Sequence, residues 1–185
     1  MPYGAGMSEE LDPACVAAHT EAATPTPRTL LVVFASPVAR ALMRHGRDLG
    51  FTTVLLEPVW DRMTFNDRAH ADVIRTAPGG EYPDDNTDVV VTDHHREELP
   101  GLLRTLLDSP FRWLGVMGNA RHVPAWVDQL RTLGVDEASI KRIHRPIGLD
   151  IGSRTPPEIA IATLAGLIAD RNGRSGGFFP PGPLS

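Results

Sequence analysis

The sequence predicts an α/β domain: a Rossmann-like, doubly wound, mainly parallel sheet of about five to six strands with helices on both faces. Apolar runs of strand length alternate with helical patterns along residues 29–174. These runs are continuously apolar, which is typical of parallel strands that are covered on both faces. The length of 185 residues suits one such domain with tails.

The first strand–helix–strand unit covers residues 30–56. A strand over Leu30–Phe34 precedes a helix over 38–49, and a second strand follows over 51–56, with Glu57 at its end. A dinucleotide-binding unit carries glycines in its first turn and an acid after its second strand. The acid is present as Glu57, but the turn reads Phe34-Ala35-Ser36-Pro37. The pattern therefore favours the fold over an ordinary Rossmann grip on NAD.

A third strand over 71–75, expected near an edge of the sheet, and a fourth over 88–92 continue the alternation. The fourth ends in Asp93-His94-His95-Arg96, and ligands of open α/β sheets bind beyond such carboxyl ends. Two readings stay open for His94: a ligand contact, or a solvated loop that caps the next helix. Two adjacent histidines without a third ligand are a weak metal signal, so no metal site is expected.

A helix over 97–107 leads to a fifth strand over 111–117. Gly118-Asn119-Ala120-Arg121-His122 then opens a further helix that ends near Leu133. Gly118 permits close backbone approach, a helix N-terminus favours an anion, and Arg121 adds positive charge. We therefore favour an anion-binding turn here over a purely structural one.

The segment over 142–158 organises the remainder of the chain. Thr155 is a good N-cap, Pro156 suits the first helical position, and Glu158 completes a capping box. The helix that follows, to about Ala169, is apolar on most sides and is expected to be buried. A buried helix thus anchors a polar loop over 144–154, and loops held by rigid scaffolds often carry binding residues.

Each polar residue of this loop has two readings. His144 is either a structural histidine bonded to backbone or a ligand contact. Asp150 and Arg154 either contact a ligand or form a local ion pair, which is the commoner fate of such residues. Gly148 and Gly152 are expected to serve backbone turns.

Composition excludes several classes of protein. A formal net charge of −5 disfavours a general nucleic-acid or membrane-surface binder, and no apolar run is as long as a membrane span. The single cysteine, Cys15, rules out an internal disulfide framework and fits a reducing cytoplasm. The N-terminus lacks the basic and apolar regions of a signal peptide.

The two ends of the chain have a different composition from the domain. Residues 1–28 are expected to form an arm, flexible or docked, with a short helix over 9–19, in which Cys15 is a small apolar residue rather than a reactive thiol. Residues 175–185 form a Pro-rich tail that carries Phe178 and Phe179. The apolar ends lead us to expect a homodimer.

Two segments resemble a known family. His144-Arg145-Pro146-Ile147-Gly148-Leu149-Asp150-Ile151-Gly152, followed by Thr155-Pro156-Pro157-Glu158-Ile159-Ala160, closely resembles the terminal motif of the XdhC/CoxI family. Leu114-Gly115-Val116-Met117-Gly118-Asn119, with Arg121 after it, resembles that family's last-strand motif. The resemblance covers about Thr29 to Arg174 and is strongest from Val89 onward.

The resemblance implies a Rossmann-like C-terminal domain of an accessory protein for molybdenum hydroxylases of the xanthine dehydrogenase and CO dehydrogenase type. Such proteins bind molybdenum cofactor (molybdopterin), hold it during sulfuration and pass it to the target enzyme. The implied partners are that hydroxylase and a cysteine desulfurase or a separate homologue of the family's N-terminal domain. The cofactor-binding residues expected on this basis are Ser36, Glu57, His94, Gly118, Asn119, Arg121, His144, Gly148, Asp150 and Arg154.

Three departures from the family separate this chain from its better-known members. The family's Gly-Ala-Gly-His type turn is replaced by Phe34-Ala35-Ser36-Pro37, its His-Asp-His segment is matched only in part by His94-His95-Arg96, and a short arm replaces its N-terminal domain. The function that the resemblance implies is a chaperone without a catalytic step. The alternatives are an NAD(P)- or nucleotide-dependent oxidoreductase that uses Glu57 and His94, and a non-catalytic interaction subunit with a vestigial cleft.

Overall fold

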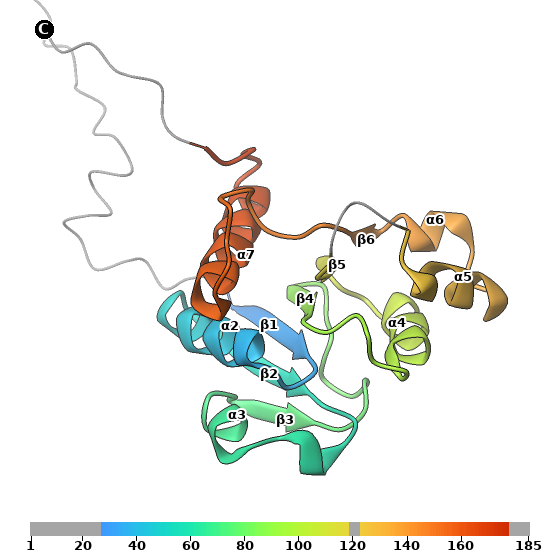
Figure 1. The fold of residues 1–185 in the computed structure, drawn as a ribbon, viewed down its shortest axis with the longest axis horizontal. Helices are drawn as coiled ribbons and strands as arrows, with labels where there is room; N and C mark the ends of the chain where they lie inside the picture. Colours follow the sequence, from blue (N-terminus) through green and yellow to red (C-terminus); the bar gives the residue numbers. More distant parts are fainter. Residues whose placement is uncertain (1–26, 119–122, 178–185) are drawn as a thin grey trace, which may run out of the picture.

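One parallel sheet organises the residues that the computed structural model describes, 27–118 and 123–177 (Figure 1). Its spatial order is β3-β2-β1-β4-β5-β6, and every neighbouring pair is parallel. This order places the topological switch point between β1 and β4, as in Rossmann folds. The strands are β1 (Arg28–Val33), β2 (Phe51–Leu56), β3 (Val73–Arg75), β4 (Thr87–Val91), β5 (Trp113–Val116) and β6 (Ile143–His144). The predicted fold class is confirmed.

Helices cover both faces of the sheet, as Figure 1 shows. On one face α2 (Pro37–Asp48) packs beside α7 (Pro156–Arg171), and on the other α4 (Leu99–Leu107) packs beside α5 (Ala125–Thr132). The short elements are η1 (Trp60–Arg62) and α3 (Phe65–Ala69), between β2 and β3, and α6 (Glu137–Ile140), before β6. No helix in the described parts of the chain has the length and apolar character needed to cross a membrane.

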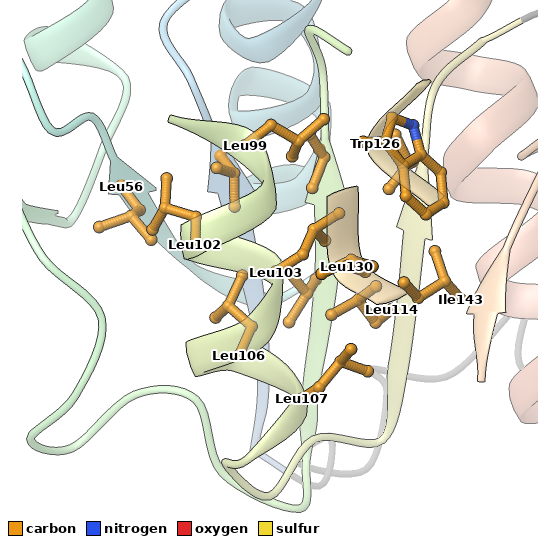
Figure 2. Packing of buried hydrophobic residues seen from close by; sticks show 14 of the residues in the cluster. Leu56, Leu99, Leu102, Leu103, Leu106, Leu107, Leu114, Trp126, Leu130 and Ile143 are labelled. Carbon is orange, nitrogen blue, oxygen red and sulfur yellow. The ribbon is translucent and has the colours of Figure 1, made fainter. Parts of the chain in front are cut away.

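Alternate residues of the central strands enter two separate cores. Leu31 and Val33 of β1 pack with α4 and α5, whereas Leu30 and Val32 pack with α2 and α7. Figure 2 shows the α4 side, where leucines of α4 meet β2, β5 and β6, and where Trp126 closes one end. Because both faces of β1 are buried, its sequence is continuously apolar.

Most predicted elements are found within two residues of their expected limits, and β3 lies at the sheet edge as predicted. The helix that was expected to open at Gly118 starts later than predicted. Its residues 119–122 lie outside the described chain, and α5 begins at Ala125 with Pro124 as its N-cap. A proline disfavours helical geometry at the residue before it, here Val123, so a helix that opens at Gly118 cannot run through Val123 without strain.

The strand β6 is not predicted, because Ile143 and His144 fall in the segment over 142–158, which is expected to be irregular. A strand of two residues, of which only Ile143 is buried, is too short to show the repeated alternation of apolar and polar residues that identifies a strand in a sequence. The parallel pairing of β6 with β5 nevertheless decides where the following loop begins. It brings Arg145 to the same end of the sheet as the loops after β4 and β5.

Candidate binding site at the carboxyl ends of the strands

The first turn is closed by its own backbone and side chains. Phe34, fully buried, has a left-handed backbone with φ of 72°, and its N–H donates to the Leu56 carbonyl at 2.9 Å. Ser36 caps α2 by accepting a hydrogen bond from the Ala39 N–H at 2.9 Å, and its hydroxyl lies 3.0 Å from that of Thr92. The Ser36 oxygen is thus committed to joining β1, α2 and β4.

Glu57, at the end of β2, is fully buried and holds this turn from the other side. Its carboxylate accepts hydrogen bonds from the N–H groups of Ala35 at 3.0 Å and Val59 at 3.1 Å. Arg96 donates to both carboxylate oxygens, at 2.8 and 3.2 Å. Burial raises the pKa of the Glu57 carboxyl, but these hydrogen bonds and the Arg96 charge outweigh burial and leave the pKa below its ordinary value.

Arg96 connects this closed turn to an open cavity. Its guanidinium lies 4.4 Å from the centre of the Phe34 ring and 3.4 Å from the Glu98 carboxylate. The Arg96 side chain is 13% exposed to solvent. The cavity, of about 470 Å³, lies beyond the carboxyl ends of β4, β5 and β6. Its lining residues are His94, His95, Arg96, Glu97, Pro124, Ala125, Trp126, Gln129 and Arg145.

The walls of this cavity carry mainly positive charges and hydrogen-bond donors. Arg96 and Arg145 are cationic, whereas Glu97 is the acid among the lining residues. Pro124 and Ala125 place the N-terminus of α5, with its exposed donors and partial positive charge, at the wall. Arginine guanidinium groups suit phosphate and carboxylate oxygens particularly well. We call this cavity, with its nine lining residues, the cationic cavity.

His94 and Gly118 meet at one wall of the cationic cavity. A Cβ atom on Gly118 would stand 3.0 Å from the Arg145 Nε and 3.5 Å from the His94 Nδ1, so glycine allows both side chains to approach the backbone. Burial lowers the pKa of the His94 imidazole, and the charges of His95 and Arg145 lower it further. His94 is therefore a neutral hydrogen-bonding group at pH 7.

The predicted residues of the C-terminal loop do not line the cationic cavity. His144 is exposed and stacks on Trp113, with ring centres 4.9 Å apart and an interplanar angle of 16°. Gly148, with φ of +80°, packs against the backbone of α7, and Leu149 donates its N–H to the Ala162 carbonyl at 3.0 Å. The backbone-turn role expected for Gly148 and Gly152 agrees with their positive φ angles.

Asp150 and Arg154 are both exposed, and among the described residues no ion pair joins them. The backbone N–H of Arg154 instead donates to Glu158 at 2.8 Å, beside the predicted capping box of α7. Asn119 and Arg121 lie outside the described residues. The structure thus brings together His94 and Gly118, and it places Ser36 separately, in the first turn, which Glu57 holds through the Ala35 N–H.

Two arginines that contribute to the site were not selected from the sequence. Arg96 follows the fourth predicted strand, and Arg145 lies in the C-terminal loop beside the cis Arg145–Pro146 bond. Nothing local distinguishes either from a solvated arginine. Both arginines follow a strand of the parallel sheet, Arg96 after β4 and Arg145 after β6. This shared position indicates a common site only once β6 is recognised as a strand.

Comparison with known proteins relates this geometry to a family and to relatives of greater length. A family model described as the XdhC Rossmann domain matches residues 30–167. The uncharacterized protein YqeB of Escherichia coli (strain K12) is 39% identical over 93 residues, which make up 50% of this chain and 17% of YqeB.

A solved structure described as a xanthine dehydrogenase (BH1974) from Bacillus halodurans has a TM-score of 0.64 at 22% identity. The match covers 80% of this chain and 44% of that chain, so this chain corresponds to less than half of the neighbour's length. At this identity the likeness shows the fold alone.

Proposed function

The chain belongs to the XdhC Rossmann domain family, and from this premise we propose that it is an accessory protein for a molybdenum hydroxylase of the xanthine dehydrogenase or CO dehydrogenase type. Its cargo is molybdenum cofactor, which it binds and presents for insertion. The observation that carries this proposal is the cationic cavity, because it offers arginines and a helix N-terminus to an anionic ligand at the ligand-binding end of the sheet.

The donors of the cationic cavity fit the phosphate or nucleotide end of a pterin cofactor. Arg96 and Arg145 supply charge-assisted hydrogen bonds, and neutral His94 supplies a further polar contact beside them. Among the described residues, no group of three or more His, Cys, Asp or Glu is arranged to hold a metal ion. When bound, the cofactor would supply its own molybdenum–dithiolene group, and the cationic cavity would bind and orient its anionic end.

The geometry disfavours an NAD(P)-dependent oxidoreductase. In such enzymes the first turn and the acid after β2 face the dinucleotide. Here the Ala35 N–H is bonded to Glu57, Ser36 caps α2, and Glu57 is fully buried against Arg96. A dinucleotide would have to displace all of these contacts before it could bind in the ordinary manner.

Thermal unfolding of the purified protein with different ligands tests this assignment. Samples contain anaerobically prepared molybdenum cofactor, NADH or inorganic phosphate. A ligand that binds the native state at a hundred times its Kd adds about 2.7 kcal/mol, which raises Tm by roughly 5–10 °C. We expect this shift with molybdenum cofactor and none with NADH.

The other outcomes contradict the proposal in different ways. A shift with NADH alone would assign nucleotide-dependent chemistry to the chain despite its closed first turn. The absence of any shift would leave an interaction subunit with a vestigial cleft as the better account.

A further inference from the structure

We propose that the amino-terminal arm of this chain seats residues 11–18, which include its longest apolar run, in a groove between α2 and α7. The proposal concerns the opposite face of the sheet from α4 and α5 and does not depend on the ligand of the cationic cavity. The arm precedes the first described residue, Pro27, by sequence.

The groove is an apolar surface on helices that are otherwise well packed. It has a volume of about 320 Å³, and its lining residues are His45, Asp48, Leu49, Ile161, Leu164, Ala165 and Ile168. Ile161 is 52% exposed, although Ala160 and Leu164, its neighbours on α7, are buried. An aliphatic side chain of this size favours a covered position.

The chain enters the described structure at one end of this groove. Arg28 donates a hydrogen bond to the carbonyl of Leu49, a groove residue, at 2.5 Å, and its guanidinium lies 4.6 Å from the centre of the Phe51 ring. Arg28, at which the arm joins the domain, is thus held next to the C-terminal end of α2. Residues 19–27 reach at most about 30 Å when extended, whereas the groove along α7 from Ile161 to Ile168 is only about 10 Å long.

The composition of the arm matches a narrow apolar groove. Its longest apolar run is Ala14-Cys15-Val16-Ala17-Ala18, in which every side chain is small. The helix predicted over 9–19 would place Leu11, Cys15 and Ala18 on one face, because residues three and four apart are neighbours on a helix. Small side chains allow a third helix or strand to approach two packed helices closely.

One basic residue beside the groove, Arg44, could face the acidic arm, although Asp48 in the groove lining is itself an acid. Residues 1–26 contain no Lys or Arg, and they contain Glu9, Glu10, Asp12 and Glu21. On α2, Arg40 and Arg47 pair with Asp67 and Asp72. Arg44 is exposed and forms no ion pair with any described residue. Docking of the acidic arm beside α2 would give Arg44 an opposite charge.

The C-terminal tail is a poorer occupant. A Cβ atom on Gly176 would stand 2.7 Å from a methyl carbon of Leu149, so the exit from α7 runs beside the loop over 147–149. That loop contacts α7 at Ala162 and Gly166, whereas the groove uses Ile161, Ala165 and Ile168, on a different face of the helix. The chain after α7 therefore starts on a face of this helix that does not border the groove.

Disulfide trapping tests the proposal with the full chain. Cys15 is the only cysteine, so Ala165→Cys creates a single defined pair without other changes. Under mild oxidation we expect rapid formation of an intramolecular disulfide, seen as a faster-migrating monomer on a non-reducing gel. Ala138→Cys, an exposed alanine to cysteine change on α6, is the matched control and should cross-link at least tenfold more slowly.

Specificity is checked by adding Ile161→Glu to the Ala165→Cys chain, which should slow cross-linking without lowering the Tm of a chain that lacks residues 1–26. Equal rates at Ala165 and Ala138 would overturn the proposal, because an undocked arm samples both. A disulfide-linked dimer that forms first would assign the groove to a second copy of the chain and would also overturn it.

Discussion

Phe34, Glu57 and Arg96 together replace the glycine-rich first turn of an ordinary dinucleotide-binding unit. Phe34 keeps a backbone conformation that is costly for a residue with a Cβ atom, by about 1–2 kcal/mol. Its buried ring and the Arg96 guanidinium stacked on it compensate for that cost. The turn is rigid because side chains of the protein itself occupy it.

The buried Glu57–Arg96 ion pair should make stability depend on pH. Because the pKa of Glu57 is lower in the native state than in the unfolded chain, the pair stabilises the fold above the unfolded-state pKa, near 4.5. This stabilisation is lost as pH falls through the native pKa. Glu57→Gln leaves the Arg96 charge underpaired and should lower the free energy of unfolding by about 3 kcal/mol at pH 7.

Chemical denaturation of Glu57→Gln and the parent chain between pH 7 and pH 3 measures this effect. The exposed neighbour provides the control, since Glu97→Gln should change stability by less than about 0.5 kcal/mol. The difference between parent and Glu57→Gln should shrink as pH falls below about 4.5. A difference that stays constant across the pH range would show that the Glu57 charge does not stabilise the turn.

The sequence predicted individual residues of the site unevenly. Glu57 was found because an acid at the end of a second strand is a local pattern. Its partner Arg96 is 39 residues away and is brought to it only by the pairing of β1 with β4. The burial of Glu57 cannot be predicted from the sequence either, because an acid after the second strand is equally compatible with an open cleft.

Among the helices, α7 has the clearest start in the sequence, because the signals for its start are local. The Thr155–Glu158 capping box forms as expected, with Pro156 at the first helical position. The start of α5 was misplaced although Pro124 is a local signal for it, whereas β6 was missed because tertiary context, not periodicity, determines a strand of two residues. The loop between β6 and α7 is held by packing and by hydrogen bonds to α7, from the Leu149 N–H to the Ala162 carbonyl and from the Arg154 N–H to Glu158.

The contact between that loop and α7 predicts different costs for two glycine substitutions. Gly148 and Gly152 have φ of +80° and +68°, so Ala at either position incurs the left-handed backbone cost of about 1–2 kcal/mol. At Gly148 the new Cβ atom also stands 3.0 Å from the α7 backbone at Ala162 and Thr163, whereas at Gly152 nothing lies within 4 Å. Gly148→Ala should therefore cost about 1–3 kcal/mol more than Gly152→Ala.

Urea unfolding of the two variants tests this difference, with Gly152→Ala as the internal control for backbone strain. Since both variants share the unfolded-state effect of replacing glycine, the difference isolates the steric contact. Equal destabilisation would mean that the loop moves away from α7 at little cost and does not hold the end of the sheet in place.

At the scale of the whole molecule, the two halves of the sheet differ in what they offer a ligand. The half built on β1 and β2 is closed at its carboxyl end by Glu57 and Ser36. The half built on β4, β5 and β6 opens into the cationic cavity. Arg96 belongs to both, since Glu57 holds it in a fixed orientation at the cavity wall. This asymmetry is the basis for proposing an anionic cargo that lies over one half only.

The central claim is that the cargo binds in the cationic cavity, and an anaerobic binding titration tests it most directly. Molybdenum cofactor is titrated against the parent chain, Arg145→Gln and Arg104→Gln, the last an exposed arginine on α4 that does not line the cavity. Loss of a charge-assisted hydrogen bond should raise Kd by about tenfold or more for Arg145→Gln. Arg104→Gln should bind like the parent. Equal affinity of all three proteins would contradict the account and place the cofactor elsewhere.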